Sequence, residues 1–233
     1  MVKGSPPRIR LPITGQVLRR IGAHLAASSD SDKPVLWAIA CSAFFGFFRL
    51  GELLPESEAS FNTALNLAWG DVAVDNHQAP RMVRVHLKKS KCDQFGVGSD
   101  IFLGRSGSDL CPVAAVVEYV HIRGPAPGPF FLTSDRKTVT KHWFVGKVRE
   151  ILMAIGLPQQ QYAGHSFRIG AATTAALAGV EDSMIQTLGR WQSSAFLQYI
   201  RTPKEQLAAV SAVLAHGAGA SMPPNTPPTT HAP

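Results

Sequence analysis

Near the start of the chain, hydrophobic residues follow the spacing of α-helices. Apolar residues recur every three or four positions over 17–25, after Thr14, whose side chain can cap a helix. The run 35–48 is apolar on every side and follows Pro34, a residue suited to the first turn of a helix. We therefore expect an amphipathic helix, a fully buried helix, and a short helical stretch over 49–54.

A shorter period follows, typical of β-strands. Residues 65–72 predict one strand, and residues 82–87 predict a second, in which apolar and polar side chains alternate. A loop with glycines over 88–99 leads to a third short strand over 101–103. Together these segments predict a small three-stranded antiparallel sheet.

The chain then returns to helical spacing. Thr202-Pro203-Lys204-Glu205 is a capping box with proline at the first helical position, which indicates the start of a last helix. The predicted fold class is therefore mainly α with a small three-stranded antiparallel β-sheet (α+β). The helices expected in this half of the chain cover 112–121, 140–155, 168–177, 183–188, 194–200 and 203–215.

The same patterns divide the chain into three parts. Residues 1–13 are basic and rich in proline, and we interpret them as a leader or the remnant of a linker. Residues 14–215 are expected to form one folded domain. Residues 216–233 are rich in Pro, Thr and Ala, a composition typical of a disordered tail.

Composition and charge narrow the class of protein. The chain is 45% hydrophobic and 17% charged, which excludes wholesale disorder. It has 23 Lys and Arg against 16 Asp and Glu, and the net charge of +7 favours a polyanionic partner such as nucleic acid.

Other sequence features bear on the compartment. No apolar stretch near the start could serve as a signal peptide, and the longest apolar run is too short to cross a bilayer. The three cysteines include no C-x-x-C pair. We therefore expect a reducing intracellular compartment and no membrane partner.

Several motifs of metal and nucleotide chemistry are absent from the sequence. There is no H-E-x-x-H, no Walker loop, no G-x-G-x-x-G and no tight carboxylate cluster for two metal ions. The sequence therefore predicts neither a metal nor a cofactor. An enzyme of this kind that acted on phosphates would rely on cationic side chains.

Cationic side chains do stand at three conspicuous places. Arg49 follows the most apolar run of the chain, and Glu52, three residues later, could orient it from the same helix face. His165 and Arg168 share a face near a predicted helix N-terminus, where an anion is stabilised. The third place is the segment 188–201, in which basic residues accompany a tryptophan and a tyrosine.

In this order, the three segments resemble the active site of the tyrosine recombinases. This family comprises phage integrases, Cre-like recombinases and the recombinases of eukaryotic mobile elements. The resemblance covers residues 14–215. The amino-acid sequences of segments 110–115 and 189–201 are most similar to those of DIRS-like retroelement and crypton recombinases.

The resemblance implies a specific active site. Tyr199 would be the nucleophile, and Arg49 and Arg168 would hold phosphate oxygens through their planar forks. Lys91 would protonate the departing 5′-oxygen, and His165 would accept the tyrosine proton or bond to the phosphate. The full implied set is Arg49, Lys91, His165, Arg168, Trp191 and Tyr199, with Glu52 in support.

Some assignments in this implied site stay open. Trp191 would pack against the Tyr199 helix, with its indole N–H available to a phosphate oxygen. Two neighbouring lysines compete with Lys91 for the role of general acid. Candidates for contact with DNA outside the catalytic set are Lys88, Lys89, Arg190 and Arg201.

The implied activity is that of a site-specific DNA recombinase or integrase, working without metal through a 3′-phosphotyrosine intermediate. Its partners would be double-stranded DNA and further protomers in a synaptic homotetramer, with exchange of C-terminal helices. Complete recombinases usually carry an N-terminal helical domain, for which the residues ahead of Thr14 are too few. The location would be nuclear in a eukaryote, and otherwise cytoplasmic or at the nucleoid. A catalytically silent domesticated DNA-binding module and a type IB topoisomerase are the alternatives.

Overall fold

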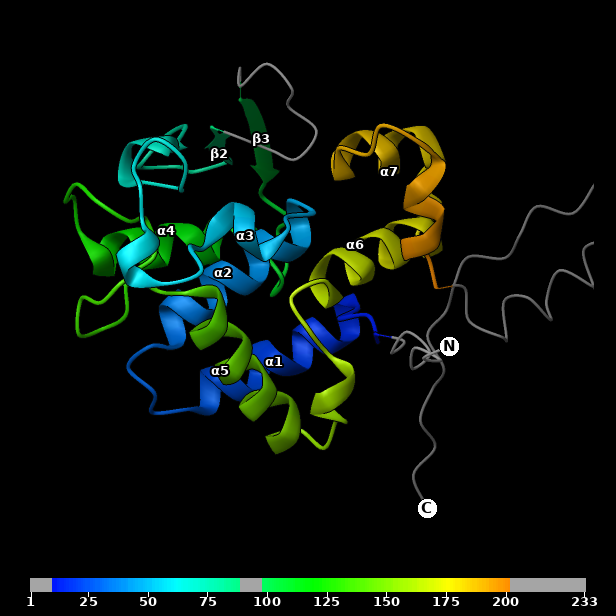
Figure 1. Cartoon of the computed structure of the whole chain (residues 1–233), viewed down its shortest axis with the longest axis horizontal. Helices are drawn as coiled ribbons and strands as arrows, with labels where there is room; N and C mark the ends of the chain where they lie inside the picture. Colours follow the sequence, from blue (N-terminus) through cyan, green and yellow to red (C-terminus); the bar gives the residue numbers. More distant parts are fainter. Residues whose placement is uncertain (1–9, 89–97, 202–233) are drawn as a thin grey trace, which may run out of the picture.

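The chain folds mainly into α-helices with one small sheet (Figure 1). It is described by a computed structural model over residues 10–88 and 98–201. The strands are β1 (Val72–Val74), β2 (Met82–Leu87) and β3 (Ser99–Gly104). The helices are α1 (Gly15–Ala27), α2 (Lys33–Phe45), α3 (Leu50–Leu53), α4 (Pro112–Arg123), α5 (Lys141–Ala154), α6 (Ser166–Leu177) and α7 (Asp182–Gly189). The predicted fold class is confirmed.

Helix α2 lies at the centre of the hydrophobic core. Its sequence is apolar on every side, so no face of the helix suits water, and its residues are buried almost without interruption from Val35 to Phe44. Helices α1, α4 and α6 pack around it, as Figure 1 shows. The C-terminal end of α2 therefore emerges from the core next to α6.

The three strands form an antiparallel sheet in the order β1-β2-β3. Val83 pairs with Leu103, and Val85 pairs with Ile101. Val83, Val85 and Leu103 are buried on the face that meets α4, because alternate residues of a strand point the same way. The loop from β2 to β3 includes residues 89–97, which lie outside the described residues.

The first strand is shorter than the sequence predicts. A strand is expected over 65–72, but β1 begins at Val72, and Trp69–Asp71 form a short 3-10 helix, η2. The Asp71 carboxylate accepts a hydrogen bond at 2.7 Å from the main-chain N–H three residues earlier. The Trp69 ring stacks on Phe130 with ring centroids 6.0 Å apart. This partner is distant in sequence, so alternation alone could not reveal the turn.

Helix α6 lies directly against the segment that precedes α1. The N–H of Ile13 donates to the carbonyl of Ser166 at 2.9 Å. Gly170 permits this approach, because a Cβ there would stand 1.7 Å from the Ile13 carbonyl oxygen. The small residues that follow Arg168 in the sequence therefore serve close packing.

Replacing Gly170 by alanine is expected to lower the free energy of unfolding by about 1–3 kcal/mol, because the clashing Ile13 oxygen is main chain and cannot rotate away. Gly146→Ala is the matched control, since a Cβ at Gly146 in α5 meets nothing within 4 Å. That control is expected to gain about 0.5–1 kcal/mol. Urea unfolding of both variants measures the difference. Equal stability of the two variants would contradict the packing.

The last described elements are α7 and the 3-10 helix η4 (Ser194–Tyr199). The sequence predicts a helix over 194–200, and the structure has the tighter 3-10 form there. Both elements pack against α6 and are coloured yellow to orange in Figure 1. The helix predicted over 203–215 and the tail 216–233 lie outside the described residues.

The leader proposed over 1–13 is described only from residue 10, so the predicted domain boundaries stay predictions. A separate point concerns the helices in residues 10–88 and 98–201. None of them is both long enough and apolar enough to span a bilayer.

Candidate active site

The turn after α2 presents Arg49. Within this turn, Phe47 has a φ of 51°, a left-handed backbone conformation that is costly for a bulky side chain. Arg49 takes the N-cap position of α3. The Glu52 carboxylate accepts hydrogen bonds from the Arg49 main-chain N–H at 2.8 Å and from Arg49 Nη1 at 2.9 Å. The side chains of Arg49 and Glu52 are 22% and 7% exposed, so this ion pair lies largely out of water.

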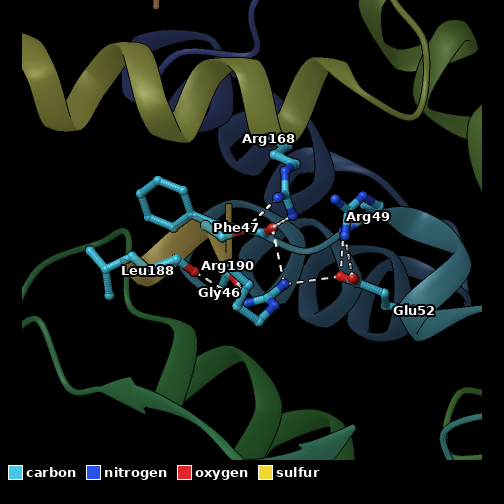
Figure 2. Close-up of polar contacts among 8 residues, drawn as sticks. Gly46, Phe47, Arg49, Glu52, Arg168, Leu188 and Arg190 are labelled. Carbon is cyan, nitrogen blue, oxygen red and sulfur yellow. Dashed lines mark hydrogen bonds and ion pairs between the residues drawn. The ribbon is translucent and has the colours of Figure 1, made fainter. Parts of the chain in front are cut away.

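Arg168 enters the same region from α6 (Figure 2). Its side chain is fully buried. Nη1 donates to the Phe47 carbonyl at 2.8 Å, and Nη2 donates to the Gly189 carbonyl. The guanidinium carbon lies 4.1 Å from the centre of the Trp191 ring and 6.0 Å from that of Tyr199. Arg168 therefore joins the α2–α3 turn to the segment that carries the two aromatic residues.

Burial also affects the charge of Arg168. Loss of water around the guanidinium lowers its pKa to about 10, and the positive charges of Arg49 and Arg190 contribute to the lowering. Arg168 therefore remains protonated at neutral pH. Its positive charge is stabilised by the carbonyl groups that accept its hydrogen bonds and by the face of the Trp191 ring.

Arg190 approaches the Arg49–Glu52 pair from the opposite side. It follows α7 in a left-handed conformation with φ of 55°. Its Nη2 lies 2.9 Å from Glu52 Oε2, so Glu52 bridges Arg49 and Arg190. Figure 2 shows the three arginines around this carboxylate and the Phe47 carbonyl.

The cluster of Arg49, Glu52, Arg168 and Arg190 carries more positive than negative charge. Three guanidinium groups face one carboxylate, and the pairing of Glu52 with two of them leaves an excess of positive charge. Charges in a largely dry environment interact strongly, so an anion is the ligand best suited to balance this cluster. A phosphodiester fits, because its oxygens match the forked donors of arginine.

Trp191 and Tyr199 lie beside this cluster. Their ring centroids are 5.2 Å apart. Trp191 is buried, and its Nε1 has no hydrogen-bond partner among the described residues. Tyr199 is half-buried, and its main-chain carbonyl accepts a hydrogen bond from Thr173 Oγ1 at 3.2 Å. Thr173, on α6, thus fixes the end of η4.

Gly189 allows Trp191 to lie in this place. A Cβ at Gly189 would stand 1.5 Å from Trp191 Cζ3. The Gly189 carbonyl also accepts from Arg168. The approach of the Trp191 ring therefore requires the glycine of the Leu-Gly-Arg-Trp segment, a contact that the sequence does not reveal.

His165 is exposed and occupies the N-cap position of α6, three residues before Arg168. Its carbonyl accepts the Ile169 N–H at 2.9 Å. The helix thus begins directly after the residue that the sequence singles out, and His165 is exposed while Arg168 is buried in the core.

The competing lysines fall on both sides of the described boundary. Lys88 Nζ lies 2.5 Å from Asp71 Oδ2 and donates to the Thr63 carbonyl, so this lysine holds the start of the β2–β3 loop to η2. Lys89 and Lys91 lie outside the described residues. Arg201 is exposed, and its guanidinium donates to the Gln198 carbonyl.

The structure thus gathers most of the predicted site residues. The candidates it brings together are Arg49, Glu52, Arg168, Trp191, Tyr199 and Arg190. No sequence pattern indicated that Thr173 or the carbonyls of Phe47 and Gly189 belong to this arrangement. Within residues 10–88 and 98–201, no group of three or more His, Cys, Asp or Glu side chains could hold a metal ion.

Comparison with known proteins identifies the fold. The sequence matches no protein-family model and no curated protein. The structure of XerA recombinase matches with a TM-score of 0.63 at 15% identity, over 91% of this chain and 66% of that chain. XerH site-specific recombinase, bound to its palindromic difH substrate after cleavage, matches with a TM-score of 0.64 at 13% identity, over 91% and 55%. A lambda integrase tetramer bound to a Holliday junction matches with a TM-score of 0.59 at 17% identity, over 86% and 50%.

The chain therefore has the fold of the tyrosine recombinase catalytic domain, as the sequence resemblance predicts. At these identities the comparison establishes the fold. The chain spans 66% of the length of XerA and 55% of the length of XerH.

Proposed function

We propose that this chain is a DNA-cleaving and rejoining enzyme of the tyrosine recombinase family, acting as a site-specific recombinase or integrase. The observation that carries the proposal is the convergence of Arg49, Arg168 and Tyr199, from three separate segments, on a cluster with excess positive charge. Donors of this kind stabilise the charge that develops on phosphate oxygens during attack. The net charge of +7 and the fold shared with XerA and XerH support DNA as the substrate.

Tyr199 is the tyrosine best placed to act as the nucleophile. The chain has three tyrosines. Tyr119 and Tyr162 are 3% and 4% exposed, and burial raises the pKa of both, that of Tyr119 to about 12. Tyr199 is half-buried and lies beside a guanidinium group. Its phenol is therefore the one that a DNA phosphate can reach.

The proposed reaction is a transesterification. The Tyr199 phenol oxygen bonds to the phosphorus while the bond from phosphorus to the 5′-oxygen breaks. His165 takes the phenol proton, and Lys91 supplies a proton to the departing 5′-oxygen. The 3′-phosphotyrosine ester conserves the bond energy, so a second 5′-hydroxyl can reverse the step without ATP. Arg49 and Arg168 hold the non-bridging oxygens throughout.

Binding of DNA requires the cluster to open. Arg168 is fully buried beneath the Trp191 ring, with its guanidinium carbon 4.1 Å from the ring centre. A phosphate therefore reaches Arg168 after the Trp191 side chain moves aside, and its oxygens then replace the carbonyls of Phe47 and Gly189 as acceptors.

The proposed partners are double-stranded DNA and further copies of this chain. A homotetramer would hold two duplexes in a synaptic complex, and the predicted helix over 203–215 would pass between protomers. The solved lambda integrase tetramer on a Holliday junction supports the tetramer on DNA. The amino-acid sequence of residues 189–201 supports membership of the subgroup of DIRS-like retroelement and crypton recombinases. We propose a nuclear location for a eukaryotic host, and otherwise the cytoplasm or nucleoid.

Trapping of the covalent intermediate tests this proposal. The chain is incubated with nicked duplex suicide substrates drawn from a library with a randomised target sequence. Denaturing electrophoresis is expected to show a protein–DNA adduct, and peptide mapping by mass spectrometry is expected to place the DNA on Tyr199. No divalent metal should be needed, so the adduct is expected to form in EDTA.

Three outcomes would contradict the proposal. Attachment of DNA to a residue other than Tyr199 would identify a different nucleophile. The absence of any adduct despite tight DNA binding would leave a DNA-binding module. An adduct accompanied by relaxation of supercoiled DNA, with no recombinant product from paired sites, would identify a type IB topoisomerase instead.

A further inference from the structure

Arg190 uses both terminal nitrogens of its guanidinium group for contacts within the protein. Its Nη1 donates to the carbonyls of Gly46 at 3.0 Å and Leu188 at 3.1 Å. Its Nη2 donates to the Phe47 carbonyl at 3.3 Å and to Glu52 Oε2 at 2.9 Å. Each terminal nitrogen of arginine carries two hydrogens, so these contacts occupy all four.

These contacts join two segments that are far apart in sequence. Gly46, Phe47 and Glu52 belong to the turn that presents Arg49, whereas Arg190 directly precedes Trp191 and the η4 helix that ends at Tyr199. Figure 2 shows the guanidinium of Arg190 between the Gly46 carbonyl and Glu52. Arg190 therefore links the turn that presents Arg49 directly to the segment of the proposed nucleophile.

We propose that Arg190 is a positioning residue of the active site, which fixes the segment 188–199 against the Arg49 turn. This inference rests on the proposed function. Arg190 acts through Glu52 and two main-chain carbonyls, and the phosphate contacts are left to other arginines. Its planar fork suits this task, because a lysine ammonium is a point charge and cannot serve carbonyls and a carboxylate in the same geometry.

The contrast with Arg49 supports this division of roles. The side chain of Arg190 is 14% exposed and has its four terminal hydrogens occupied. Arg49 is 22% exposed, and its guanidinium contacts Glu52 through Nη1 alone among the described residues. Arg49 can therefore bind a phosphate without breaking its ion pair, whereas Arg190 would have to give up the link.

A positioning role predicts an effect on rate and not on affinity. Loss of the fork in Arg190→Met should let Tyr199 drift relative to Arg49, and a displacement of about 1 Å can cost about 100-fold in rate. The phosphate contacts made by Arg49 remain, so the dissociation constant for DNA should change by less than about twofold.

The experiment measures single-turnover adduct formation at saturating suicide substrate, together with DNA affinity as a function of salt. Arg190→Met is expected to slow adduct formation by about 100-fold with unchanged affinity. Arg190→Lys is expected to be nearly as slow, because charge without the fork does not restore the link. If Arg190 instead contacts a phosphate, Arg190→Met should weaken binding and reduce the slope of log K against log salt by about 0.9. That result, or rescue by Arg190→Lys, would overturn the proposal.

Arg123→Met is the matched control for structural damage. Arg123 is also buried, binds the carbonyls of Phe130, Gly124 and Pro129 through its guanidinium, and lies 4.4 Å from the Trp69 ring. Its loss should lower stability at a place remote from Tyr199. Below its melting temperature this variant is expected to form the adduct at the wild-type rate.

A measurement without DNA separates this inference from the proposed function. Hydrogen exchange of Arg190→Met is expected to be faster than wild type over 190–201 and 46–52, with helix α4 unchanged. Unchanged exchange in both segments would overturn the positioning role. Failure of the wild-type chain to form any adduct would instead contradict the proposed function.

Discussion

Replacing Tyr199 by phenylalanine is expected to abolish the covalent adduct while DNA affinity stays within about twofold of the wild type. The substitution removes the phenol oxygen and keeps the ring that packs on Trp191 at 5.2 Å. The main-chain carbonyl of residue 199 still accepts from Thr173 Oγ1, so the end of η4 should stay in place. Suicide-substrate trapping and a binding titration on the same preparation measure the two properties.

The same substitution at the other two tyrosines controls for the loss of a phenol oxygen elsewhere in the protein. Tyr119→Phe loses hydrogen bonds with the Phe130 carbonyl at 2.9 Å and the Leu132 N–H at 2.7 Å, so it is expected to cost about 1–3 kcal/mol of stability. Tyr162→Phe keeps the buried ring and should change stability little. Both variants are expected to form the adduct. Persistence of the adduct in Tyr199→Phe, or its loss in Tyr162→Phe, would identify a different nucleophile.

Replacing Glu52 by glutamine is expected to lower the free energy of unfolding by about 3–5 kcal/mol, because removal of one member of a buried ion pair leaves its partners uncompensated. Glu52 is 7% exposed and contacts two arginines, each at 2.9 Å. Glutamine preserves the shape and removes the charge. Three guanidinium groups would then share the site with no carboxylate in contact. Urea unfolding followed by tryptophan fluorescence measures the loss.

Glu56→Gln is the matched control for this substitution. Glu56 also pairs with a cation, Lys141 at 2.6 Å, but its side chain is 72% exposed. Exposed ion pairs contribute at most about 1 kcal/mol, so this variant should be nearly as stable as the wild type. A loss of the same small size in Glu52→Gln would show that Glu52 does not balance the arginine cluster.

Hydrophobic spacing predicted most of the fold because helices and strands are built from local contacts. Thr14 caps α1 as predicted, with its Oγ1 accepting the Val17 N–H at 3.4 Å. The alternation over 82–87 became β2, with Val83, Val85 and Leu87 buried. The predicted strand over 65–72 was too long, because the structure has the 3-10 helix η2 over Trp69–Asp71 and the Trp69 ring stacks on Phe130, which is distant in sequence.

The candidate site shows the same division between local and distant contacts. The three-residue spacing of Arg49 and Glu52 allows a contact within one helical turn, and the structure has that contact at 2.9 Å. The contact of Arg190 with Glu52 joins residues 138 positions apart. Spacing carries no information about such a pair, so the sequence offered Arg190 as a DNA contact with no defined role.

By itself, the sequence determined a helical fold with a small sheet, a basic chain, and an ordered set of residues suited to phosphate chemistry. The tertiary structure decided how that set is arranged. It buried Arg168 against Trp191 and placed Glu52 between two arginines. It also left Tyr199 as the half-buried tyrosine of the three. The physical reason is that burial and charge balance depend on which distant segments pack together, and packing is settled by the whole chain.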